Sequence, residues 1–80
     1  MGSKVKNEIL TAYHEIYARI ISLKVKLQET DYLAIKYAEG EITASEFAPT
    51  LTQRREWRTE INLLEDQLKV YESQLKELGG

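Results

Sequence analysis

The residues best suited to chemistry lie in one short segment, residues 53–58, which holds three arginines and the only tryptophan of the chain. On a helix, Arg54 and Arg58 lie one turn apart, and Trp57 offers a ring face for stacking. Such a cluster can contact RNA or phosphate, but the formal net charge of −2 attracts no nucleic acid. We favour a second interpretation, in which Asp31 forms an ion pair with Arg54 or Arg58 and fixes the register of the fold. Trp57 would fill the layer between them.

Other titratable residues give no pattern of a catalytic or metal site. His14 is the only histidine and there is no cysteine, so a zinc or iron site lacks its usual ligands. Glu39, Glu41 and Glu46 gather at one turn, but acid–base catalysis needs a pocket that raises the pKa of one carboxyl group. The sequence also lacks a nucleophile–base pair and a phosphate-binding loop. We therefore expect no catalytic residue, no cofactor, no metal ion and no enzyme activity.

These residues are carried by two ladders of apolar side chains, one in each half of the chain. Their steps alternate between three and four residues, which is typical of a helix packed lengthwise on another helix. The ladder positions, which we call the hairpin seam, are Ile9, Tyr13, Ile16, Ile20, Leu23, Leu27, Trp57, Ile61, Leu64, Leu68, Tyr71, Leu75 and Leu78.

The two ladders agree on one antiparallel arrangement. When the first residue of one ladder is paired with the last residue of the other, and so on inward, the residue numbers of each facing pair add up to 87 or 88. A near-constant sum is what an antiparallel helical hairpin requires. The same register places Arg54 opposite Ala34, and Trp57 opposite Thr30 and Asp31.

We therefore expect an all-α fold, in which residues 1–80 form a single domain, an antiparallel two-helix hairpin. The first helix is predicted over about residues 4–39, because no Gly or Pro interrupts this stretch and Gly40 suits its C-terminal end. Thr30 and Asp31 favour caps over helix interiors, which leaves open whether the helix is kinked there.

The second half of the hairpin is predicted to start with a short helical turn. Thr43 and Glu46 have the spacing of a capping box, which places a short helix within residues 40–48. Pro49 suits the first turn of a helix but not its interior. We therefore expect the second long helix to run over about residues 49–78.

A second set of apolar residues lies beside the seam: Leu10, Tyr17, Ile21, Leu63 and Val70. One interpretation is a wide hairpin face that solvent partly wets. The other is a surface for an oligomer or a partner, most simply a dimer that forms a four-helix bundle. We favour the oligomer, because a single hairpin made from a chain of 80 residues can bury only a small hydrophobic core.

Several residues in the middle of the chain form a further pattern: Leu27, Thr30, Asp31, Tyr32, Ile35, Lys36, Glu39, Gly40, Phe47, Ala48, Pro49, Gln53, Arg54, Arg55, Trp57, Arg58, Ile61 and Asn62. Over residues 27–65, this pattern resembles short helical proteins associated with tail-fibre and tail-assembly genes in phages and prophages of gut Firmicutes. It is also similar to tail assembly chaperone segments, although the spacing differs and a helical piece replaces their proline-rich stretch. The resemblance implies no catalytic residue.

The resemblance implies a non-enzymatic phage structural or assembly protein, and the heptads imply a coiled-coil module for protein–protein interaction. Two alternatives stay open: a small phage regulator or anti-defence protein that binds and inhibits a host protein, and a nucleotide- or RNA-binding helical oligomer. The expected partner is a protein, either a second copy, a phage protein or a host protein.

Composition also restricts where the protein works. No apolar run approaches the ~20 residues that cross a bilayer, and the N-terminus lacks the apolar region of a signal peptide. We therefore expect no membrane partner and no secretion by a signal peptide. If the resemblance holds, the protein lies in the cytoplasm of the bacterial host or in the virion.

Overall fold

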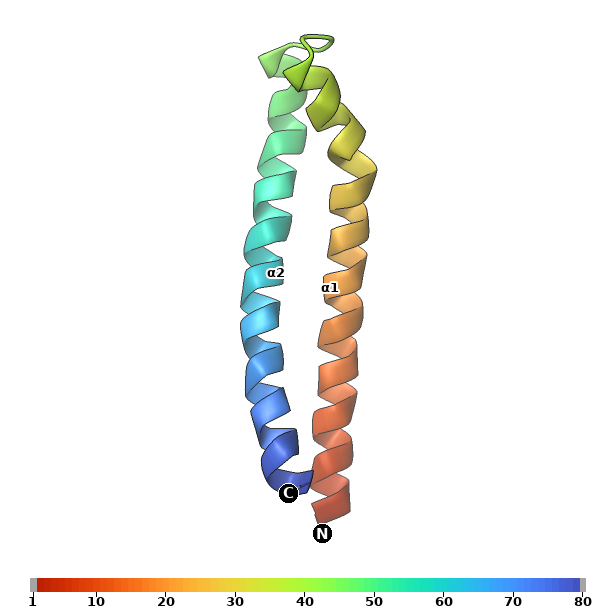
Figure 1. The fold of residues 1–80 in the computed structure, drawn as a ribbon, viewed down its shortest axis with the longest axis vertical. Helices are drawn as coiled ribbons and strands as arrows, with labels where there is room; N and C mark the ends of the chain where they lie inside the picture. Colours follow the sequence, from red (N-terminus) through yellow and green to blue (C-terminus); the bar gives the residue numbers. More distant parts are fainter. Residues whose placement is uncertain (1, 80) are drawn as a thin grey trace.

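The computed structural model describes residues 2–79, which form two long helices, α1 (Gly2–Ala38) and α2 (Ala44–Gly79). The helices run antiparallel, so Gly2 and Gly79 lie at the same end of a rod of 59 × 16 × 15 Å (Figure 1). Within residues 2–79 there is no strand. The predicted all-α helical hairpin is therefore confirmed.

α1 ends at the glycine that the sequence indicates. Gly40 has a φ of +79°, a conformation that favours glycine. The Gly40 N–H donates to the Tyr37 carbonyl at 3.1 Å, and the Glu41 N–H donates to the Lys36 carbonyl at 2.8 Å. This pair of bonds is a Schellman motif, which satisfies two of the last carbonyls of the helix.

α1 is continuous through Thr30 and Asp31. The Thr30 hydroxyl lies within hydrogen-bonding distance of the carbonyls of Lys26 and Leu27, at 3.1 and 3.0 Å. A threonine that bonds back to the preceding turn fits inside a helix, and so the helix does not restart there. α1 begins two residues before, and ends one residue before, the predicted helix over about residues 4–39.

α2 begins directly after Thr43, earlier than predicted. The Thr43 N–H donates to a Glu46 carboxylate oxygen at 3.2 Å, and the Glu46 N–H donates to the Thr43 hydroxyl at 3.1 Å. This is the predicted capping box, but the helix it opens continues through Pro49. Pro49 removes a single backbone bond, to the carbonyl of Ser45, and Ser45 is exposed to water. Phe47 is buried, which anchors the first turn.

The register of the hairpin differs from the predicted one. Arg54 bonds Thr30 at 2.6 Å instead of facing Ala34. Nearer the turn, the rings of Tyr37 and Phe47 stack with their centroids 4.9 Å apart. In both pairs the residue numbers add up to 84, not 87 or 88.

The shorter connection explains this shift. Because α2 starts before Pro49, only residues 39–43 separate the two helices. α2 is therefore displaced by one seam step, which still places apolar residues opposite apolar residues. In this register Leu75 faces Ile9, and Leu78 lies beyond the last seam residue of α1.

The core occupies the middle of the rod. Its residues are less buried toward the end opposite the turn, which we call the open end. Ile20, Leu23, Ile61 and Leu68 are buried, and Tyr13, Ile16, Leu27, Trp57 and Leu64 pack against them. Near the chain ends, Ile9, Tyr71 and Leu75 are only half-buried. Leu78 is 46% exposed, so this predicted seam residue contributes little to the core.

Candidate functional site

Arg54 is the one charged side chain that the hairpin buries among residues 2–79, at 6% exposure. One guanidinium nitrogen, Nη1, donates to the Leu27 carbonyl at 2.7 Å and to the Thr30 hydroxyl at 2.6 Å. The other, Nη2, donates to the Asp31 carboxylate at 2.9 Å. All these partners belong to α1, so the Arg54 network ties the two helices together.

The Arg54 network bears directly on the proposed roles of residues 53–58. Arg54 would have to break three hydrogen bonds before it could bind a phosphate outside the hairpin. The face of Trp57 is also occupied, because Lys26 Nζ lies 5.9 Å from its ring centroid. Arg58 is exposed and takes no part in the ion pairs of residues 2–79. Asp31 therefore pairs with Arg54 alone.

A second ion pair crosses the hairpin between Arg19 and Glu60. Arg19 Nε donates to Glu60 Oε2 at 2.6 Å, and Nη2 donates to Oε1 at 3.3 Å. The hydrogen bond from Arg19 lowers the pKa of the Glu60 carboxyl group below its usual value. Both side chains are well exposed. The sequence analysis missed this pair; each residue directly precedes a seam residue, which was the available signal.

The most extensive surface feature is an apolar strip along α1. Its members, which we call the α1 apolar face, are Leu10, Tyr17, Ile21, Val25, Tyr32 and Ile35. Leu10 is half-buried, and the other five side chains are 44–57% exposed. At 100° per residue these positions fall within a band of about 80° on one side of the helix.

Sequence analysis found only part of this face. Leu10, Tyr17 and Ile21 were identified, whereas Val25, Tyr32 and Ile35 were not. The signal was present, because Val25, Tyr32 and Ile35 fall on the same side of the helix as Leu10, Tyr17 and Ile21 at 100° per residue.

The structure also separates two residues that the sequence analysis grouped with this face. Leu63 and Val70 follow Glu60 by three and ten positions, so all three lie on nearly the same side of α2. Glu60 bonds Arg19, whereas Tyr17 points about 160° away from Arg19 around α1. Leu63 and Val70 therefore lie on the opposite broad face of the hairpin, and the five predicted residues do not form one surface.

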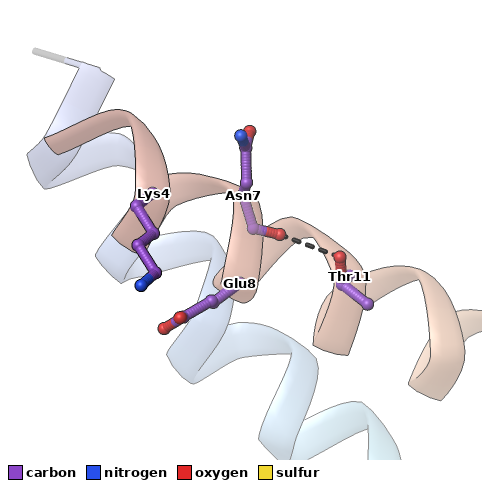
Figure 2. A pocket seen from close by; sticks show the side chains of 4 residues that line it. All are labelled: Lys4, Asn7, Glu8 and Thr11. Atoms are coloured by element: carbon purple, nitrogen blue, oxygen red, sulfur yellow. Dashed lines mark hydrogen bonds between the residues drawn. The ribbon is translucent and has the colours of Figure 1, made fainter. Parts of the chain in front are cut away.

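A hollow lies on the surface at the first turns of α1, lined by Lys4, Asn7, Glu8 and Thr11 (Figure 2). The Thr11 hydroxyl donates to the Asn7 carbonyl at 2.9 Å. All four side chains are exposed and belong to one helix. The hollow is thus an open groove along a helix surface, without the convergent side chains of a binding site.

The titratable residues singled out in the sequence are dispersed. Among residues 2–79, no group of three or more His, Cys, Asp or Glu side chains is placed to hold a metal ion. His14 is exposed, and its ring packs edge-to-face with that of Tyr13, with the ring centroids 6.0 Å apart. Glu46 caps α2, and Glu39 and Glu41 are exposed at the turn.

Neither described helix has an apolar stretch long enough to span a bilayer. In comparisons with known proteins, no family model, no curated protein and no solved structure matches this chain.

Proposed function

We propose that this protein is a non-enzymatic module for protein–protein interaction that binds its partner through the α1 apolar face. The observation that carries the proposal is the row of five well-exposed apolar side chains with half-buried Leu10. Isolated apolar residues are common on protein surfaces, but six on one side of a helix, interrupted only by His14 and Gln28, are typical of an interaction site.

The shape of this face favours a helical partner. From Leu10 to Ile35 the row covers 26 residues, which is about 38 Å along α1. A straight, narrow row of this kind fits one helix that lies lengthwise against it, as in helical bundles. The tyrosine hydroxyls of Tyr17 and Tyr32 suit the edge of such a contact, where one end of the side chain stays wet.

The resemblance of residues 27–65 to phage tail-associated proteins supports a more specific form of this proposal. In that form the protein is a structural or assembly component of a phage, and its partner is a second copy or another phage protein. It then works in the cytoplasm of the host bacterium or in the virion. A phage regulator that inhibits a host protein would use the same face, and the identity of the partner separates the two.

A photocrosslinking experiment tests the proposal. The photoreactive residue p-benzoylphenylalanine replaces Ile21 on the α1 apolar face in one variant. In the control variant it replaces Gln67, which lies between Leu63 and Val70 on the opposite face. Each variant is irradiated, both purified and in native lysate. We expect a discrete protein adduct from position 21 and none from position 67.

The outcomes distinguish the possible roles. A tail component in the adduct supports the assembly role, and a stoichiometric host protein supports the regulator. If position 21 gives no adduct, or if the two positions label the same proteins equally, the proposed function is wrong.

A further inference from the structure

We propose that the partner of the α1 apolar face is a second copy of this chain, with the two α1 helices antiparallel. This inference rests on the proposed function and names its partner. The two-fold axis passes close to Ser22 and Leu23, where the middle of the row lies. The resulting four-helix dimer places each α1 against the other α1.

Four of the six members of the face meet one another in this arrangement, and the two tyrosines, Tyr17 and Tyr32, face Gln28 and His14 of the copy. Around the axis, Ile21 lies opposite the copy's Val25, and at the ends Leu10 lies opposite the copy's Ile35. Between these aliphatic contacts, Tyr17 lies opposite the copy's Gln28, so that a phenol faces an amide. The facing numbers add up to 45 or 46 along the row. Because the interface is isologous, each of these contacts occurs twice.

Charge complementarity selects the antiparallel orientation. α1 carries Lys4 and Lys6 in its first turns, whereas Glu39 and Glu41 directly follow its last turn, and all four are exposed. The proposed axis brings Lys6 near the copy's Glu39 and Lys4 near the copy's Glu41. A parallel pair would instead gather like charges at each end. Antiparallel helices also place each helix dipole against the opposite one.

One pair of like charges at the edge of the proposed interface should weaken the dimer, and it gives a further test. Glu15 and the copy's Glu29 approach each other on the outer side of α1, where both are exposed. Like charges in contact weaken an interface. The replacement Glu15→Lys should therefore tighten the dimer, although it touches no apolar residue.

The rest of the hairpin supports a closed dimer over a longer assembly. On the opposite broad face, Leu63 and Val70 are two helical turns apart, with polar Gln67 between them. That face has these two large apolar side chains of α2, whereas the α1 apolar face has six. A molecule with a single apolar face closes into a pair and does not form filaments.

The first test is the mass in solution by light scattering during size-exclusion chromatography. We expect the wild type at about 50 µM to have twice the 9.3 kDa mass of one chain. The double variant Ile21→Lys with Val25→Lys should have the monomer mass, because four lysines would meet at the axis. The matched control, Leu63→Lys with Val70→Lys, should remain dimeric. Circular dichroism of each variant verifies that the hairpin is intact.

The second test fixes the orientation by charge exchange. Lys4→Glu with Lys6→Glu should weaken the dimer, and Glu39→Lys with Glu41→Lys should weaken it as well. Each exchange should raise the dissociation constant about tenfold at low salt, as several exposed ion pairs together can. The chain that carries all four changes should regain the wild-type constant, and its recovery should disappear in high salt.

The outcomes separate this inference from the proposed function. A wild-type chain that is monomeric at 50 µM, or a dimer that survives both lysines at the axis, overturns self-association. A dimer without recovery in the four-fold charge variant overturns the antiparallel orientation. If position 21 crosslinks only to a different protein, the proposed function holds and the inference is wrong.

Discussion

The two ends of the hairpin hold their helices together by different means. At the turn end, three devices act over a short stretch: the Schellman motif at Gly40, the capping box at Thr43, and the Arg54 network. At the open end the helices meet through half-buried Ile9 and Leu75. The turn end is specified by several directional bonds, whereas near the open end a single exposed bond, from the Tyr13 hydroxyl to Glu72 Oε1 at 3.2 Å, accompanies the apolar contact.

This difference shows which contacts select the register. Displacing α2 by one seam step still sets apolar residues opposite apolar residues, so the seam tolerates both the predicted and the observed register. Arg54 does not tolerate both. In the observed register it meets the Leu27 carbonyl, the Thr30 hydroxyl and the Asp31 carboxylate. In the predicted register it would face Ala34, and a buried charge without partners is costly.

The largest effect is therefore expected from the loss of Arg54. Arg54→Ala should lower the free energy of unfolding by about 3 kcal/mol, because it removes buried packing and all three hydrogen bonds from Arg54 to α1. Urea denaturation followed by circular dichroism measures this change. Arg55→Ala is the matched control, since Arg55 is the exposed neighbour and should change stability by less than about 0.5 kcal/mol. Equal losses in both variants would contradict the role given to the Arg54 network.

Arg54→Met separates stability from register. Methionine fills a similar volume without a charge, so it should cost less than alanine. The seam alone would then have to choose between two registers. In labelled chains diluted with an excess of unlabelled chains, spin labels at exposed Gln28 and Glu56 should give one intramolecular distance in the wild type and a broader or double distribution in Arg54→Met. One sharp, unchanged distance would show that the apolar seam selects the register by itself.

At the open end we expect a smaller and graded effect. Leu75→Ala should cost about 1 kcal/mol, less than a fully buried leucine, because Leu75 is only half-buried. Leu78→Ala should change stability by less than about 0.5 kcal/mol, since Leu78 lies past the end of the seam. Thermal unfolding of the two variants measures the difference. A larger loss for Leu78→Ala would favour the predicted register over the observed one.

The capping box at the turn end should contribute a similar, modest amount. Thr43→Ala removes the hydroxyl that accepts from the Glu46 N–H, and an N-cap of this kind is worth about 1 kcal/mol. Thr59→Ala is the control, because the exposed Thr59 hydroxyl bonds only the Arg55 carbonyl one turn before it. Chemical denaturation should show a clear loss for Thr43→Ala alone. Equal behaviour of the two would mean that Phe47 burial, rather than the cap, starts α2.

Sequence reasoning predicted the hairpin and an ion pair of Asp31 with Arg54 or Arg58, but it did not decide between the two arginines and it misplaced the register. Heptad spacing decides which sides of two helices meet, and it leaves their displacement along the axis nearly free. The displacement was misjudged because Pro49 was taken as the start of α2, although a cap at Thr43 was recognised. The surface was incompletely predicted for a related reason. Val25, Tyr32 and Ile35 were not recognised as members of the α1 apolar face. Leu63 and Val70 were assigned to that face because no contact between α1 and α2 was known that could show which side of α2 they occupy.

The smallest expected effect concerns the exposed pair in the middle of the rod. The hydrogen bond from Arg19 lowers the pKa of Glu60 below its ordinary value of 4.5. A lowered pKa in the folded state means that the carboxylate stabilises the fold above pH 4.5, and that this contribution disappears as the pH falls through the lowered pKa. The melting temperature of the wild type should therefore slightly exceed that of Glu60→Gln at pH 7, and the difference should vanish near pH 3. A difference that persists at pH 3 or in high salt would mean that Glu60 stabilises the hairpin by packing rather than by charge.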